Sequence, residues 1–242
     1  MQDFLEKEEG IHQIKQANEA RAAFYFTLAS LFYRELTLDQ IESLSQSNLA
    51  KQGEDSEEMH RAYTLMFRAV KKPSETVRQN LAVDYAHTFL AAGTYDGRMA
   101  TPYESVFTSE EGLLMQDARD DVYRLFCQEH IGVRESSHEP EDHLSFEFEF
   151  LAILAQRCNA ALREQNIAEA QRLSNLASDF LRQHILNWID DLCDVIDTTA
   201  KSDFYRGLSL LTRAFTHDDK ETLREMTGVF TEVSYIAESF ED

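Results

Sequence analysis

Apolar residues recur every three, four or seven positions along most of the chain, the spacing expected of one face of an α-helix. In the first long segment this stripe consists of Ile14, Ala17, Phe24, Leu28 and Leu31. Arg21 interrupts the stripe, so we expect its stem to pack while its charged head reaches water or pairs with an acid. Further helices are predicted over residues 38–44 and 59–70, from Pro73-Ser74-Glu75 to about Ala91, and from Ser109 to about Cys127.

The second half of the chain begins with the longest helical pattern. Phe146, Phe148 and Phe150 alternate with polar residues, as in a β-strand. The helical interpretation is stronger, because a stripe at three-to-four spacing continues for five turns and Pro140 stands where a first-turn proline belongs. That stripe is Leu144, Phe148, Leu151, Ala155, Cys158 and Leu162. Later helices are predicted near residues 173–180, 186–196 and 203–215, with a last helix opening at Asp218.

A polar segment, residues 132–141 (GVRESSHEPE), separates these two halves. It contains a glycine and a proline, so we interpret it as a hinge. The N-terminal lobe would then span residues 1–131 and the C-terminal lobe residues 142–242. The sequence thus predicts an all-α bundle of roughly ten helices in two lobes joined by a hinge.

Composition supports this class and restricts the partners. Eight glycines and three prolines among 242 residues leave few turn formers for a many-stranded β fold. Lysine and arginine number 23 against 44 aspartates and glutamates, which gives a formal charge of −21. Such a chain repels nucleic acid and anionic lipid, so we expect no nucleic-acid ligand and a preference for a cationic partner.

The sequence also bears on location. The longest uncharged apolar run, between Arg21 and Arg34, has 12 residues, whereas a membrane-spanning helix needs about 18 or more. The acidic start lacks the basic region of a secretion signal, and there is no Arg-Arg pair of an export signal. The cysteines lie far apart among apolar neighbours, so we predict buried, reduced thiols at Cys127, Cys158 and Cys193. We expect a cytoplasmic protein without an integral membrane segment.

Motifs for common catalytic chemistry are weak or missing. The sequence contains no phosphate loop, dinucleotide fingerprint or nucleophile elbow. His138 and His143 resemble a zinc-protease pair, but they are five residues apart rather than four and Pro140 interrupts the helix. The Glu-x-x-His spacing of di-iron bundles occurs twice, at Glu57–His60 and in the linker at Glu135–His138. A metal-binding helical enzyme built on these clusters therefore remains an alternative.

Two segments are candidates for binding. Acids crowd the hinge and the start of the next helix at Glu139, Glu141, Asp142, Glu147 and Glu149. They form either an ordinary solvated helix start or the acidic edge of a cleft suited to a guanidinium group. Aromatic residues between positions 85 and 107 form either core or an apolar groove for a peptide. An acidic helical scaffold without any binding site is a further alternative.

Three segments carry a resemblance to a known family. Val83 to Phe89 resembles a D-Y-x-x-L-F motif with Thr88 in the place of leucine, residues 102–106 resemble a P-Y-E-S-V turn, and residues 139–144 resemble an E-P-x-D-H-L signature. These motifs, in this order and spacing, are typical of the TorD/DmsD family of cytoplasmic redox-enzyme maturation chaperones. A weaker similarity runs from Arg21 to Phe32 in the first helix.

The resemblance implies an all-helical chaperone that catalyses no reaction and has no cofactor or metal. Members of the family bind the twin-arginine signal peptide of a molybdopterin-containing reductase and hold the apoenzyme back from export until its cofactor is inserted. The signal-peptide-binding residues that carry over are Tyr85, Phe89, Pro102, Tyr103, Glu104, Ser105, Glu139, Pro140, Asp142 and His143.

The expected roles of these residues differ. Asp142 and Glu139 are predicted to contact guanidinium groups, and the two prolines to shape the backbone, while Ser105 caps the turn. His143 either holds the hinge, by bonding Asp142 or a backbone group, or lines the site. A hinge between two lobes is compatible with a monomer and with a domain-swapped dimer.

Overall fold

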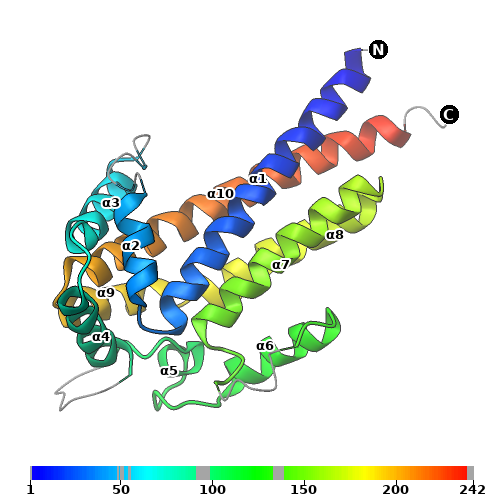
Figure 1. Cartoon of the computed structure of the whole chain (residues 1–242). Coiled ribbons are helices and arrows are strands. Elements are labelled where there is room, and N and C mark those ends of the chain that lie inside the picture. Colours follow the sequence, from blue (N-terminus) through cyan, green and yellow to red (C-terminus); the bar gives the residue numbers. More distant parts are fainter. Residues whose placement is uncertain are drawn as a thin grey trace.

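Long helices form the frame of the molecule (Figure 1). The computed structural model of the chain describes residues 2–47, 49, 52–53, 56–90, 99–132 and 139–238. Over these residues the elements are α1 (Gln2–Tyr33), α2 (Leu38–Gln46), α3 (Glu57–Val70), α4 (Glu75–Phe89), α5 (Glu104–Thr108), α6 (Asp117–Gln128), α7 (Leu144–Arg163), α8 (Ile167–Phe180), the π-helical turn η2 (Leu181–Ile185), α9 (Ile189–Thr199) and α10 (Asp203–Glu238). These ranges contain no β-strand, so the predicted all-α class is confirmed.

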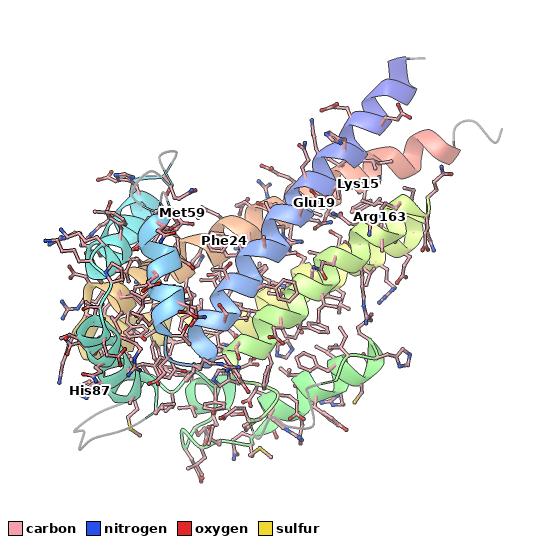
Figure 2. The ribbon with its side chains drawn as sticks, in the orientation of Figure 1. Lys15, Glu19, Phe24, Met59, His87 and Arg163 are labelled. Carbon is pink, nitrogen blue, oxygen red and sulfur yellow. The ribbon has the colours of Figure 1, made fainter. Side chains whose placement is uncertain are left out.

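The helix α1 lies at the centre of the packing. It runs along α7 and also contacts α10, while α3 packs on the other end of α10 and α8 packs on α7 (Figure 1). Phe24 of α1, labelled in Figure 2, stacks on Phe215 of α10 with ring centroids 3.9 Å apart. Gly207 lets α10 approach α3 closely, because a Cβ atom there would lie 2.7 Å from the carbonyl oxygen of Ala62.

The two predicted lobes share one hydrophobic core. Tyr25 and Phe32 of α1 pack against Phe148 of α7, with ring centroids 5.5 and 6.2 Å away, and Phe89 of α4 packs against Tyr205 of α10 at 5.4 Å. A single cluster of buried residues therefore contains side chains from both halves of the chain. The division into residues 1–131 and 142–242 is not confirmed by this packing and stays a prediction, and most of the hinge, residues 133–138, lies outside the described part of the chain.

Arg21 is buried and pairs with an acid, which is one of the two arrangements expected for it. Its guanidinium Nε and Nη2 donate to the carboxylate of Asp219 on α10 at 2.5 and 3.0 Å. The Tyr25 hydroxyl donates to the same carboxylate at 2.6 Å, and Asn18 accepts a third Arg21 hydrogen bond at 2.8 Å. This network ties α1 to α10 inside the apolar core, where an unpaired charge would be costly.

Most predicted helices are present, but some boundaries are wrong. The helix predicted to start at Ser109 does not form, because Ser109 is the C-cap of α5 and α6 begins at Asp117. Between them Gly112 and Met115 have φ of 64° and 61°, values that a right-handed helix cannot contain.

Two further boundaries differ from expectation. The separate last helix predicted from Asp218 is part of the continuous α10, whose interior carries the Arg21 partner Asp219. Pro140 is not in the first turn of a helix, because it comes before the N-cap His143 of α7, and Pro73 likewise precedes the N-cap Ser74 of α4.

The cysteine prediction is correct for two of the three thiols. Cys158 and Cys193 are buried, whereas Cys127 is exposed on α6 and corrects the expectation of a buried thiol there. None of the helices in the described ranges combines the length and the apolar character needed to cross a bilayer.

Candidate functional site

Two of the three motif segments meet directly in the structure. The amide of Glu104 donates to the carbonyl of Asp142 at 3.0 Å, and the amide of Leu144 donates to the carbonyl of Pro102 at 2.9 Å. These bonds form an antiparallel bridge between Tyr103 and His143. The backbone thus joins the segment Pro102–Ser105 to the segment 139–143.

Asp142 faces inward at this bridge and is fully buried. Its Oδ2 accepts a hydrogen bond from the backbone amide of Ser105 at 2.9 Å, and its Oδ1 has no hydrogen-bond partner among the described residues. The hydroxyl of Ser105 accepts from the amide of Gln116 at 3.2 Å, so it holds the next loop rather than only its own turn. Burial raises the pKa of Asp142, and the bond from Ser105 acts against that rise.

Glu104 is also buried, and its partners come from a distant part of the chain. His184 Nδ1 hydrogen-bonds its Oε2 at 2.9 Å, and the Asn187 amide donates to its Oε1 at 2.7 Å. His184 belongs to the π-helical turn η2, and such turns often mark functional positions. The acid of the P-Y-E-S turn is thereby fixed to the second half of the chain.

A third acid, Glu147, is completely buried beside these two. Neither of its carboxyl oxygens has a hydrogen-bond partner among the described residues. Burial first, and then the neighbouring acids Glu104 and Asp142, raise the pKa of Glu147 well above its usual range. Three carboxyl groups therefore lie close together inside the protein where the motifs meet.

His143 has a structural role in this arrangement. It is the N-cap of α7, and its Nδ1 accepts from the Ser145 amide at 3.2 Å and hydrogen-bonds the Ser145 hydroxyl at 2.7 Å. Burial lowers the pKa of His143 to about 3, so the ring is neutral at pH 7. These hydrogen bonds hold the backbone at the start of α7, which is one of the two roles expected of His143.

The exposed edge of the bridge is formed by Glu139 and Tyr103. The Tyr103 hydroxyl donates to Glu139 Oε2, while Glu139 itself remains exposed. Burial, and then the hydrogen bond to Glu139, raise the pKa of Tyr103. The carbonyl of Pro140 accepts from the His143 amide at 3.1 Å, which closes the turn that presents Glu139.

Tyr85 and Phe89, predicted as either groove or core, are core. The Tyr85 hydroxyl donates to the carbonyl of Phe32 at 2.9 Å, and both rings are buried on α4. Asp84, the acid of the same motif, accepts from the amides of Lys201 and Ser202 at 3.0 and 2.7 Å and so caps the start of α10. This motif joins α4 to α1 and α10.

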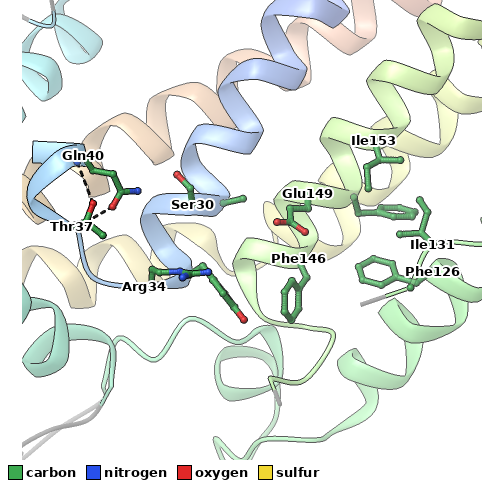
Figure 3. Close-up of a pocket in the computed structure, with 13 residues that line it drawn as sticks. Ser30, Arg34, Thr37, Gln40, Phe126, Ile131, Phe146, Glu149 and Ile153 are labelled. Carbon is green, nitrogen blue, oxygen red and sulfur yellow. Dashed lines mark hydrogen bonds between the residues drawn. The ribbon is translucent and has the colours of Figure 1, made fainter. Parts of the chain in front are cut away.

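The described surface has a groove elsewhere, between α1, α6 and α7, with a volume of about 530 Å³ (Figure 3). Its apolar lining includes the half-buried Tyr33, Ile131 and Ile153, with Phe126, Phe146 and Phe150 buried behind them. Glu149 and Arg34 also line it, and both are exposed. The capping box of Thr37 and Gln40, drawn with dashed lines in Figure 3, stands at one end.

Aromatic rings connect this groove to the bridge. The His143 ring lies 4.9 Å from Tyr103, 5.8 Å from Phe146 and 6.2 Å from Tyr33, measured between centroids. Tyr33 and Phe146 line the groove, and Tyr103 carries the hydrogen bond to Glu139. A chain of ring contacts that passes through the buried His143 ring therefore connects Tyr103, the partner of Glu139, to the wall of the groove.

Comparison with known proteins identifies the family. A family model described as nitrate reductase delta subunit matches residues 39–194, which is more than half of the chain. The protein named Chaperone protein TorD of Vibrio atlanticus (strain LGP32) is 30% identical over 218 residues, which cover 86% of this chain and 97% of that protein. The protein of the same name from Vibrio cholerae serotype O1 (strain ATCC 39541) is 29% identical over 223 residues, covering 89% and 97%. The chain belongs to the TorD family of redox-enzyme maturation chaperones.

Membership of the TorD family agrees with the expectation of a chaperone that is not an enzyme. Among the described residues no group of three or more histidine, cysteine, aspartate or glutamate side chains is placed to hold a metal ion. Of the two Glu-x-x-His pairs, Glu57–His60 lies on α3, and Glu135–His138 lies outside the described residues.

Two features of this TorD-family site were not predicted from the sequence: the hydrogen-bond partners of Glu104 and the burial of Glu147. His184 and Asn187 are far from the motifs in sequence and carry no motif of their own. Glu147 was grouped with surface acids. Phe146 and Phe148 flank Glu147 and are buried with it, whereas Glu149, between Phe148 and Phe150, is exposed, so the pattern of phenylalanines does not by itself decide which acid is buried.

Proposed function

We propose that this chain binds the twin-arginine signal peptide of a molybdopterin-containing reductase precursor in the cytoplasm and assists its maturation before export. The observation that carries the proposal is that the exposed acid Glu139 and the groove are connected by the ring contacts of Tyr103, His143 and Phe146. A twin-arginine peptide has the matching order of chemistry, a cationic pair followed by an apolar stretch. Membership of the TorD family supports the same conclusion.

Glu139 is the residue to which we assign the arginine contact. It is the exposed acid of the motif and is oriented by Tyr103, so a guanidinium group can approach it without disturbing the fold. Asp142, Glu104 and Ser105 are buried and internally hydrogen-bonded, and in this proposal they position the bridge. The net charge of −21 increases the rate of encounter with a cationic peptide.

The apolar stretch of the peptide is assigned to the groove. Tyr33, Ile131 and Ile153 in its wall are half-buried and offer a surface that an apolar helix or extended segment can cover. Tyr85 and Phe89 contribute indirectly by fixing α4 against the core.

Titration calorimetry with a synthetic twin-arginine peptide and its Lys-Lys version tests the proposal. Loss of the paired guanidinium contact should weaken binding by about 1.5 to 3 kcal/mol, which is about tenfold to a hundredfold. Glu139→Gln should remove most of this arginine preference. Ile153→Ser, in the groove wall, should weaken both peptides alike.

The matched control is Glu58→Gln, an exposed acid on α3, which should bind both peptides like the wild type. Equal affinity of the wild type for the Arg-Arg and Lys-Lys peptides would contradict the arginine contact. Unchanged binding in Ile153→Ser would remove the groove from the site.

A further inference from the structure

The loop between α5 and α6 exposes three consecutive large apolar side chains. Leu113, Leu114 and Met115 are 50%, 45% and 58% exposed. Single exposed apolar residues are common, but a run of three is not expected on a surface without a function. None of the three lines the groove described above.

The backbone of this loop is held from within, so the side chains are presented in a formed arrangement. The amide of Leu113 donates to the Ser109 hydroxyl at 3.2 Å, and the Gln116 side chain donates to the carbonyl of Leu114 at 2.9 Å. The Gln116 amide donates to Ser105, whose own amide binds Asp142, so the loop is anchored to the motif bridge. Met115 has a φ of 61°, a conformation that costs free energy in a residue other than glycine.

Acidic residues border the three apolar side chains on both sides. Glu110 and Glu111 precede them, and the first turns of α6 that follow carry Asp117, Asp120 and Asp121, all exposed. Arg119 is the basic residue of this stretch, and it is paired with Glu141 at 2.6 Å and Asp120 at 3.1 Å. The segment therefore offers an apolar centre with a negative border.

The negative border favours one class of binding partner for the three apolar side chains over the others. A second copy of the chain in a symmetric contact would bring the same acids face to face, on molecules that each carry −21. An anionic membrane is repelled for the same reason. A polypeptide with an apolar segment bordered by lysine or arginine satisfies both parts of the surface.

We propose that Leu113, Leu114 and Met115 form a second docking surface, which binds an apolar, basic-bordered segment of a client polypeptide. The inference rests on membership of the chaperone family and not on the signal-peptide contact proposed above. Two separate contacts on one client would raise the overall affinity above that of either one alone.

The test measures fluorescence anisotropy of a labelled leucine-alanine peptide flanked by lysines, with the full-length chain. The variant replaces the patch by Leu113→Gln, Leu114→Gln and Met115→Asn together, with asparagine chosen because it tolerates a positive φ. We expect the wild type to bind this peptide and the variant to bind at least about tenfold more weakly. The control variant, Val83→Gln with Leu90→Gln, changes two exposed apolar residues on and just after α4 and should bind like the wild type.

Other results would overturn the proposal. These are wild-type affinity in the patch variant and equal binding of a peptide flanked by glutamates. Patch-dependent binding to phosphatidylcholine vesicles, or a patch-dependent dimer in sedimentation, would assign the surface to a membrane or to a second copy instead. Because Glu139→Gln leaves this patch intact, failure of the signal-peptide proposal and failure of this one are separable.

Discussion

Glu147 gives the sharpest test of the buried acid cluster at the motif bridge. The carboxyl group is fully buried and lies beside the carboxyl groups of Glu104 and Asp142. Its pKa is raised well above the usual value of 4.5, chiefly by burial. The folded protein therefore keeps a proton on Glu147 under conditions where the unfolded chain releases it.

The sign and size of the effect follow from this difference in bound protons. Above pH 4.5 the folded state binds one proton more than the unfolded state at this residue, so the stability contributed by Glu147 falls as pH rises. The slope is about 1.4 kcal/mol per pH unit up to the raised pKa of the folded state. Glu147→Gln removes the ionisation while nearly keeping the shape. The variant should therefore gain stability relative to the wild type as the pH rises from 5 to 6.5.

The assay is urea unfolding followed by circular dichroism over this pH range. Only the difference between variant and wild type is informative, because His143 contributes a slope of opposite sign. The pKa of His143 is lowered from 6.5 to about 3, so its contribution to stability rises with pH through the same interval.

The control for this experiment is Glu58→Gln, whose side chain is exposed, and its stability should stay within about 0.5 kcal/mol of the wild type at every pH. Parallel stability curves for Glu147→Gln and the wild type would refute the reasoning. They would mean that Glu147 is ionised in the folded state, and hence that water or a positive charge reaches the acid cluster.

Three more outcomes follow from the packing. Asp219→Asn should lower the free energy of unfolding by about 3 to 5 kcal/mol in urea denaturation, because Arg21 is left buried without its counter-charge. Asp84→Ala should cost about 1 to 2 kcal/mol and lower the melting temperature, since it uncaps α10. Native protein should react quickly with a thiol reagent at Cys127 alone, and fast reaction of a second thiol would contradict the burial that raises the pKa of the others to about 11 and about 12, at Cys158 and Cys193.

Helix content could be predicted because periodicity records which face of a helix is buried. The stripe of α7 from Leu144 to Leu162 is buried as its spacing indicates. Helix boundaries were predicted less accurately where the same residues are compatible with both the start and the end of a helix. Ser109 followed by two acids is typical of a helix start, yet the left-handed backbone at Gly112 and Met115 makes it the end of α5.

The candidate site shows the same limit. The motifs assigned residues 102–105 and 139–143 to one binding site, and the structure joins these segments by backbone hydrogen bonds. The exposure of individual residues could not be predicted from the motifs. Within one turn Glu139 is exposed and Asp142 is buried, because only the second side chain points beneath the bridge toward Ser105.

By itself the sequence determined the all-α class, most of the helices, the strong negative charge and, through its motifs, the family. Each of these depends on neighbouring residues or on totals along the chain. The tertiary structure alone decided that His184 holds Glu104, that Asp219 holds Arg21, and that the apolar groove lies along α1 and α7 rather than at Tyr85 and Phe89. Such pairings join residues that are distant along the chain, and only the packing of whole helices brings their side chains into contact.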